Sequence, residues 1–226
     1  EGHKWDWFPS AAFAWRVSDE PFMAKTKSWL DDLKLRATYG VTGNAGIGVY
    51  GTKSGITFAN WSFGFQDTAA NRYILGKLPS GASLYVLGNP DTKWEKSTTF
   101  DLGFDATFLN SRLTVTFDWY RTNTNDVILL RQLPTSSGND GKYATYTNIG
   151  NTRNTGVEFT INSRNIVEKN FEWRSTLTFS ANKEEIVDLV DGTDIQIGTN
   201  KEDGTLMIGH PIKSFKTFIY EGIWKT

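Results

Sequence analysis

The chain has 226 residues, enough for one large β domain or two small ones, and its net charge of -1 excludes strong electrostatic attraction to nucleic acid. It contains no Cys, which excludes disulfides, a thiolate nucleophile and a Cys-ligated metal. No stretch approaches the ~18 consecutive apolar residues of a membrane helix. Membrane barrel strands stay possible, because each apolar residue in such a strand alternates with a polar one.

The first part of the chain predicts two strands, a helical turn between them, and then a long loop. Apolar residues occupy every second position over 11–17 and again over 33–40, which is typical of strands. Between these runs, a capping residue and an early Pro at 18–21 predict a short helical turn over residues 21–31. Residues 41–97 lose the alternation and hold many Gly, Asn, Ser and Thr with several aromatics, so we expect a long, functional loop there.

Residues 98–121, TTFDLGFDATFLNSRLTVTFDWYR, predict a long hairpin. Both strands alternate strictly, and they are separated only by residues 109–112. Pairing Phe108 with Leu113 brings all apolar residues to one face and the Thr and Asp residues to the other, whereas a slip of one residue would mix them. The pairs expected on this register are Ala106 with Val115, Phe104 with Phe117, Leu102 with Trp119, Asp105 with Thr116, and Asp101 with Tyr120.

Three further strands are predicted, over 154–163, 171–182 and 213–224. The links between strands alternate in length. Short links are expected at 18–32, 109–112 and 164–170, and long ones at 41–97, about 131–150 and 183–213. Such asymmetry is typical of outer-membrane barrels, which have short periplasmic turns and long extracellular loops.

The apolar face of these strands faces either lipid or a protein core. Strands of about ten residues match a tilted bilayer crossing, whereas ordinary strands have about five or six residues. Four aromatics, Phe108, Trp119, Phe171 and Trp173, are expected near strand ends, where the aromatic girdles of a membrane barrel lie. A soluble β-sandwich would also give alternation and buried Trp, and the alternation alone does not decide between the two.

Five segments together resemble one family of transporters. They are FPSAAFAWRVSDEPF (8–22), WLDDLKLRATYGVTGN (29–44), NPDTKWEKSTTFDLGFDATFLNSRLTVTFDWYRTNTNDVIL (89–129), NIGNTRNTGVEFTIN (148–162) and FEWRSTLTFSANKEEIVDL (171–189). In this order they look like the C-terminal half of the barrel of SusC/RagA-type TonB-dependent outer-membrane transporters. The resemblance covers most of the chain and is weakest over 45–88 and 190–210.

The resemblance implies an all-β fold: an antiparallel transmembrane β-barrel segment, here about seven strands of a barrel of about 22, with residues 1–226 all belonging to the barrel domain. It implies a Gram-negative outer-membrane protein, and the chain is expected to be a fragment that lacks the plug domain. The implied partners are a SusD-type surface lipoprotein, the TonB complex through the missing N-terminal part, outer-membrane lipid, and an oligosaccharide or peptide substrate.

Two sets of residues are candidate contacts. Aromatics of the 41–97 loop are expected to stack on sugar or pack on the lipoprotein, or else to pack the loop onto itself; they are Trp61, Phe63, Phe65 and Tyr73. Charged residues of the polar strand faces are expected to line a hydrated lumen, or else to form a solvated wall with cross-strand salt bridges; they are Asp101, Asp105, Asp118, Glu158 and Arg174.

We expect no enzyme activity, cofactor or metal site. The only two histidines are His3, near one end, and His210, in an expected loop, which does not suggest a triad or zinc site. The leading hypothesis is therefore a nutrient importer of glycans or peptides. The alternative is a soluble β-sandwich that binds carbohydrate through exposed aromatics.

Overall fold

A computed structural model describes residues 5–48, 51–59, 81–132, 144–196, 204–216, 219–220 and 222. The chain divides into two compact units. One comprises residues 1–6, 45–94 and 128–148, and the other residues 7–44, 95–127 and 149–226. The two units are described separately below.

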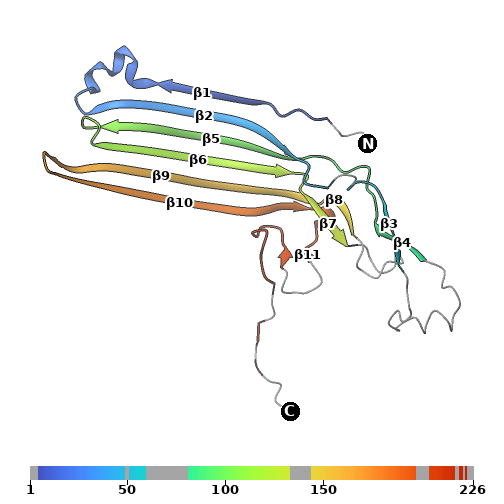
Figure 1. The fold of residues 1–226 in the computed structure, drawn as a ribbon. Coiled ribbons are helices and arrows are strands. Elements are labelled where there is room, and N and C mark those ends of the chain that lie inside the picture. Colours follow the sequence, from blue (N-terminus) through green and yellow to red (C-terminus); the bar gives the residue numbers. More distant parts are fainter. Residues whose placement is uncertain are drawn as a thin grey trace. The chain divides into compact units, whose positions relative to one another are not determined.

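Six antiparallel strands form the main sheet of the second unit (Figure 1). In their spatial order they are β1 (Ser10–Arg16), β2 (Leu30–Asn44), β5 (Glu95–Phe108), β6 (Leu113–Asn125), β9 (Gly150–Glu168) and β10 (Phe171–Leu189). Every neighbouring pair is antiparallel, so the strands run up and down, as predicted.

The predicted β5–β6 hairpin is confirmed residue by residue. Phe108 pairs with Leu113, Phe104 with Phe117, and Asp101 with Tyr120. The short link adopts left-handed backbone at Leu109, Asn110 and Ser111, with φ of 57°, 55° and 60°. The turn closes through Arg112 N–H, which donates to Phe108 O at 3.0 Å.

The helical turn and β2 differ from the prediction. Two 3-10 turns, η1 (Val17–Asp19) and η2 (Pro21–Thr26), replace the helical turn expected to continue to residue 31. Strand β2 begins at Leu30 and extends to Asn44, beyond the predicted 33–40, because it pairs with β5 over its whole length. Pairing across the sheet therefore overrode the local helical spacing.

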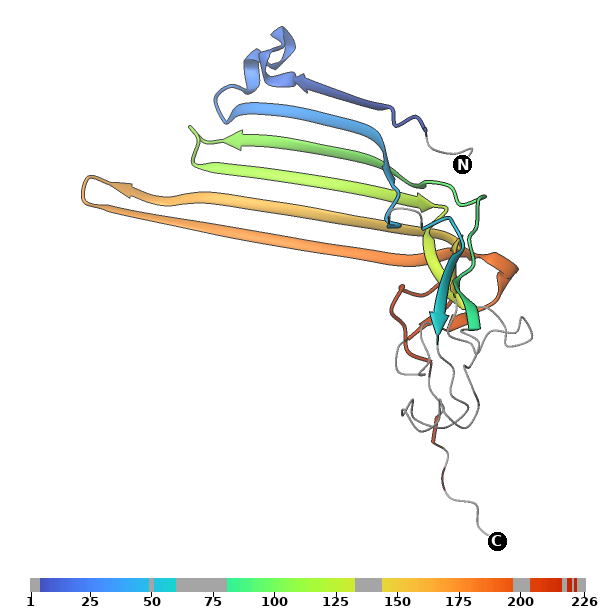
Figure 2. The same cartoon turned by 45° about the vertical axis from the view of Figure 1, so that its right-hand side comes forward.

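The β9–β10 hairpin is also longer than predicted and extends past the neighbouring strands at its turn (Figure 1, Figure 2). Bulges interrupt its register between Trp173 and Arg174 and between Ile186 and Asp188. The polar segment 183–189, expected to be loop, continues β10 because residues 150–155 of β9 pair with it.

The C-terminal strand predicted over 213–224 is wrong for the part of that segment which the structure describes. Residues 213–216, 219–220 and 222 contain only an isolated bridge, between Ser214 and Thr205. After β10 the chain forms a 3-10 turn, η4 (Val190–Gly192), and two short paired strands, β11 (Ile195–Gln196) and β12 (Thr205–Leu206).

A smaller sheet forms the first unit, from segments in or next to the long links expected at 41–97 and about 131–150. Its strands, in spatial order, are β3 (Gly55–Ala59), β4 (Gly81–Val86), β8 (Ala144–Asn148) and β7 (Ile128–Gln132). The β4–β8 pair is parallel and joins segments far apart in the sequence. A hydrogen bond also links these segments, because the side-chain amide of Asn89 donates to Tyr146 O at 3.0 Å.

The main sheet has one apolar face. Its central row, one residue from each strand in turn, is Trp15, Leu35, Phe104, Phe117, Phe159 and Phe179. We call this side of the sheet the apolar face. It is not covered: Leu177 is 57% exposed and Phe179 52%. A soluble sandwich would bury one face of each sheet, so this exposure argues against the sandwich alternative.

The apolar face has the height of a bilayer core. On β10 it runs from Phe171 to Ala181, roughly 33 Å along the strand, or about 25 Å tall at the usual tilt. Phe108, Phe171 and Trp173 lie near strand ends, as expected, but Trp119 lies in the middle of β6 because that strand continues to Asn125. No helix in the described residues is long and apolar enough to cross a membrane.

Candidate functional site

The opposite side of the main sheet, the polar face, carries an ion-pair network at its centre. Arg36 of β2 lies between Asp105 of β5 and Asp118 of β6, with Nε at 3.0 Å from Asp105 Oδ2 and Nη2 at 2.8 Å from Asp118 Oδ1. The side chains are 27% (Arg36), 36% (Asp105) and 23% (Asp118) exposed. Arg36 Nη2 also donates a hydrogen bond to Asp105 Oδ1 at 3.3 Å.

Gly103 makes this network possible. In the sheet register, Gly103 of β5 lies directly between Arg36 and Asp118. A Cβ at position 103 would clash with Asp118 Oδ1, and it would lie 3.0 Å from Arg36 Nη2 and 2.8 Å from the backbone oxygen of Phe117. The missing side chain therefore lets Arg36 reach across β5 to a strand that is not its neighbour.

Tyr120 lies flat on the polar face in a similar way. It is opposite Gly156 of β9, and a Cβ at Gly156 would come within 2.6 Å of its Cζ and hydroxyl oxygen. Glycines in two neighbouring rows thus keep both the ion pair and the aromatic ring close to the backbone.

Four of the five charged residues predicted from the sequence lie together here. Asp101 is one row from the Arg36 network, and Glu158 of β9 lies directly opposite Asp118. Lys34 of β2 is opposite Asp105 on the same face. Among the described residues of these rows on β2, β5, β6 and β9, four carboxylates (Asp101, Asp105, Asp118 and Glu158) outnumber two cations (Lys34 and Arg36), so this part of the polar face is acidic. Arg16 of β1, in the row of Lys34, pairs with Asp32.

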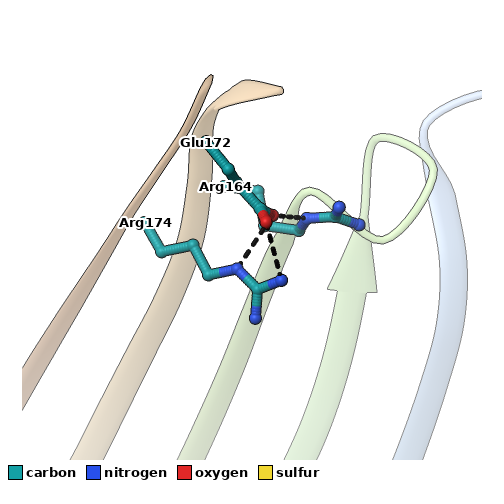
Figure 3. A network of polar contacts seen from close by, with 3 residues as sticks. All are labelled: Arg164, Glu172 and Arg174. Atoms are coloured by element: carbon teal, nitrogen blue, oxygen red, sulfur yellow. Dashed lines mark hydrogen bonds and ion pairs between the residues drawn. The ribbon is translucent and has the colours of Figure 1, made fainter. Parts of the chain in front are cut away.

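Arg174, the fifth predicted residue, lies elsewhere. It is six positions along β10 from Ser180, the partner of Glu158, which is roughly 20 Å. Figure 3 shows that it shares Glu172 with Arg164. Arg174 Nε and Nη2 donate to the two oxygens of Glu172 at 2.8 and 2.9 Å, and Arg164 Nε donates to Oε1 at 2.9 Å. This network is solvent-exposed and belongs to the hairpin end.

Hydroxyl groups cover the polar face on the other side of the acidic centre. Ser97 pairs with Thr124 at 2.8 Å and Thr99 with Thr122 at 3.0 Å between β5 and β6. A hollow of about 310 Å³ adjoins Thr99 near the β1 edge. It is lined by Ser10, Ala11, Ala12, Thr38, Tyr39, Gly40, Thr42 and Thr99. Hydroxyl groups both donate and accept hydrogen bonds, so this surface can bind water or a polar solute.

The remaining expected contacts lie outside the described residues: Trp61, Phe63, Phe65 and Tyr73. In the described ranges no three His, Asp or Glu residues are placed to hold a metal ion. Arg36, Lys34 and Tyr120 were not among the predicted site residues. The alternation of 33–40 places Lys34 and Arg36 on a polar parity, but the β2–β5 register that gives Arg36 its partners follows a link of about fifty residues.

Comparisons with known proteins agree with this geometry. Residues 2–209 match the family model for the TonB dependent receptor-like β-barrel. The chain belongs to the TonB-dependent receptor family. Proteins of this family are located in the outer membrane of Gram-negative bacteria.

Individual family members are also similar. The chain is 34% identical to TonB-dependent receptor P3 of Formosa agariphila over 100% of its length, and 31% identical to TonB-dependent receptor SusC of Bacteroides thetaiotaomicron over 98%. It spans only 22% of each of those proteins. In three dimensions it matches the RagAB peptide transporter with a TM-score of 0.74 and 28% identity, covering 92% of this chain and 21% of that one. These relatives are receptors and transporters, not enzymes.

Proposed function

We propose that the chain forms part of the wall of a nutrient import channel, within a SusC/RagA-type transporter that takes up glycan or peptide fragments. One observation carries the proposal. The same six strands expose an apolar face to one side and a polar, charged face to the other. A barrel wall needs both, because lipid contacts one side and the lumen the other.

Residues 1–226 would then all belong to the barrel domain, and the polar face would line the lumen. In this arrangement the acidic centre around Arg36 faces the transported substrate or the plug domain. Arg174 lies near the mouth formed by the short turns. Binding and passage need no covalent chemistry, so we assign no catalytic residue and no cofactor.

The direction of the wall follows from its links. The links at one end are short, such as 109–112 and 169–170, whereas those at the other end contain whole strands, as in 45–94. Because outer-membrane barrels have their short turns in the periplasm, β2 would run outward. The long links would then meet the SusD-type lipoprotein and the substrate, and the TonB complex would act from the periplasm.

The test uses adjacent residues of β6. Thr116 is on the polar face opposite Asp105, and Val115 is on the apolar face opposite Ala106. Each is changed to Cys in the full-length transporter carrying no other Cys, in outer-membrane vesicles. We expect Thr116→Cys to react with a charged, water-soluble thiol reagent and to be protected by excess oligosaccharide or peptide.

Val115→Cys is the matched control. We expect it to react only with a lipid-soluble maleimide, because its side chain faces the bilayer. Equal reaction of both positions with the charged reagent would contradict a barrel wall. If Thr116→Cys reacts with the charged reagent but neither oligosaccharide nor peptide protects it, the barrel-wall proposal stands. The proposal that substrate passes along the polar face is then rejected.

A further inference from the structure

The apolar face ends in a group of cations at the end of the sheet that has the long links. Its last apolar row on β6, β9 and β10 is Trp119, Val157 and Ala181. In the next row, Arg121 and Lys183 flank Thr155, one strand on either side of it. The side chains of this row point to the same side as the apolar face, because strand positions two apart share a face.

Arg153 of β9 completes the group one row further out. Its Nε donates to Asn123 Oδ1 at 3.2 Å, and its Nη1 lies 3.4 Å from Glu185 Oε1. Lys183 Nζ lies 2.8 Å from the other oxygen of Glu185. Glu185 therefore holds Arg153 and Lys183 near each other, and only its single charge opposes them.

Arg121 has no such neutralising partner. It is exposed, and no carboxylate pairs with it in the described part of the chain. The Lys183 side chain is 77% exposed. Three cations and one carboxylate thus lie within two rows, and Arg121 and Lys183 are about 10 Å apart across two strand spacings. Asp188, the next acid on β10, lies beyond a bulge and further from the apolar face.

We propose that Arg121, Arg153 and Lys183 bind the phosphorylated head group of a glycolipid in the extracellular leaflet. The location of this binding site in the extracellular leaflet rests on the proposed function, in which the end of the sheet with the long links is extracellular. A cation on the lumen side would meet water or substrate. On the apolar face, at the edge of the lipid contact, the neighbouring molecule is a lipid.

The chemistry favours phosphate over other anionic groups. Guanidinium groups bind phosphate oxygens through paired N–H donors, and two of the three cations are Arg. Long cationic side chains pack their aliphatic stems on apolar surface while their charges reach the head-group level. An acyl chain would then pack on the uncovered surface below, where Leu177 and Phe179 are more than half exposed.

The test compares lipids on the full-length transporter, purified and delipidated in detergent. The probe is diphosphorylated lipid A. Its binding is measured by native mass spectrometry and by the change in melting temperature of the transporter. The variant is Arg121→Gln/Arg153→Gln/Lys183→Gln. Because each cation near an anionic lipid surface contributes roughly a fivefold factor, we expect the triple variant to lose at least about tenfold in affinity. Dephosphorylated lipid A should bind both proteins equally weakly.

The matched control removes three exposed cations from the end with the short turns, in Lys25→Gln/Arg112→Gln/Lys169→Gln. It should keep the affinity of the unchanged protein. Equal loss in this control, an unchanged affinity in the triple variant, or inorganic phosphate competing as strongly as the lipid would each overturn the proposal. If the triple variant fails to fold, the single variant Arg121→Gln tests the site, because Arg121 has no ion pair in the described structure. An unchanged affinity of Arg121→Gln for lipid A would reject the site.

Discussion

Phe117 and Asp118 are neighbours in β6, yet their surroundings have opposite chemistry. Phe117 stacks on Phe104 with ring centroids 5.6 Å apart, in the middle of the apolar face. Asp118 pairs with Arg36 across a glycine on the other side. On the apolar face, side chains stand out and touch their direct cross-strand neighbours. On the polar face, small residues allow charged groups to lie along the sheet and bridge strands that are not adjacent.

The largest effect is expected from placing a charge on the apolar face. Phe117→Arg should cost about 2–4 kcal/mol in unfolding free energy, because a cation at the bilayer midplane loses its hydration. The measurement is urea unfolding of the full-length protein folded into lipid vesicles. The control is Thr116→Arg, which adds the same charge opposite Asp105 on the polar face. A loss in Thr116→Arg as large as that in Phe117→Arg would contradict the assignment of the two faces.

The polar face should be most sensitive at Gly103. Gly103→Ala should cost about 1–3 kcal/mol, because the new Cβ displaces Asp118 and crowds the backbone oxygen of Phe117. Gly40→Ala is the matched control on the same face. There the nearest atom to an added Cβ is Ser10 Cβ at 3.7 Å, an ordinary contact, and the change should stay within about 0.5 kcal/mol. Equal effects would mean that Gly103 has no special role in the network.

The length of the links explains why the β5–β6 hairpin could be predicted from the sequence and the Arg36 network could not. The hairpin has a four-residue link, so pairing Phe108 with Leu113 fixes every other pair by parity. Arg36 meets Asp105 and Asp118 only through the β2–β5 register, which no short link sets. Alternation tells which face a residue is on, but it does not tell which residue of another strand lies opposite.

The ion pair between Arg36 and Asp118 should contribute less to the free energy of unfolding than Gly103, which makes room for it. A double-mutant cycle of Arg36→Met and Asp118→Asn should give a coupling of about 1 kcal/mol, because both side chains are roughly three-quarters covered. The control cycle is Arg16→Met and Asp19→Asn, whose charges are 3.8 Å apart and 59% and 70% exposed. It should show no measurable coupling. A larger coupling in the control pair than in the Arg36 pair would contradict this ranking.

Strand ends and the smaller sheet were the least predictable parts. Residues 183–189 have a polar composition that resembles a loop, but pairing with β9 keeps them extended. The smaller sheet depends on a parallel β4–β8 contact between distant segments, which leaves no periodic signal within either strand. In both cases the partner strand, and not the local sequence, determines the structure.

The smallest effect is expected at the hairpin end of the polar face. Glu172 accepts hydrogen bonds of 2.8–2.9 Å from both Arg164 and Arg174, which is as short as the 2.8 Å contact between Arg36 and Asp118. All three side chains are at least one-third exposed, at 33% (Glu172), 42% (Arg164) and 67% (Arg174), so water and salt compensate for each lost contact. Glu172→Gln should therefore leave the unfolding midpoint unchanged at low and at high salt, although the distances match those of Arg36. A drop as large as that in Arg36→Met would show that short distance, and not cover by neighbouring side chains, sets the strength of charge pairs on this sheet.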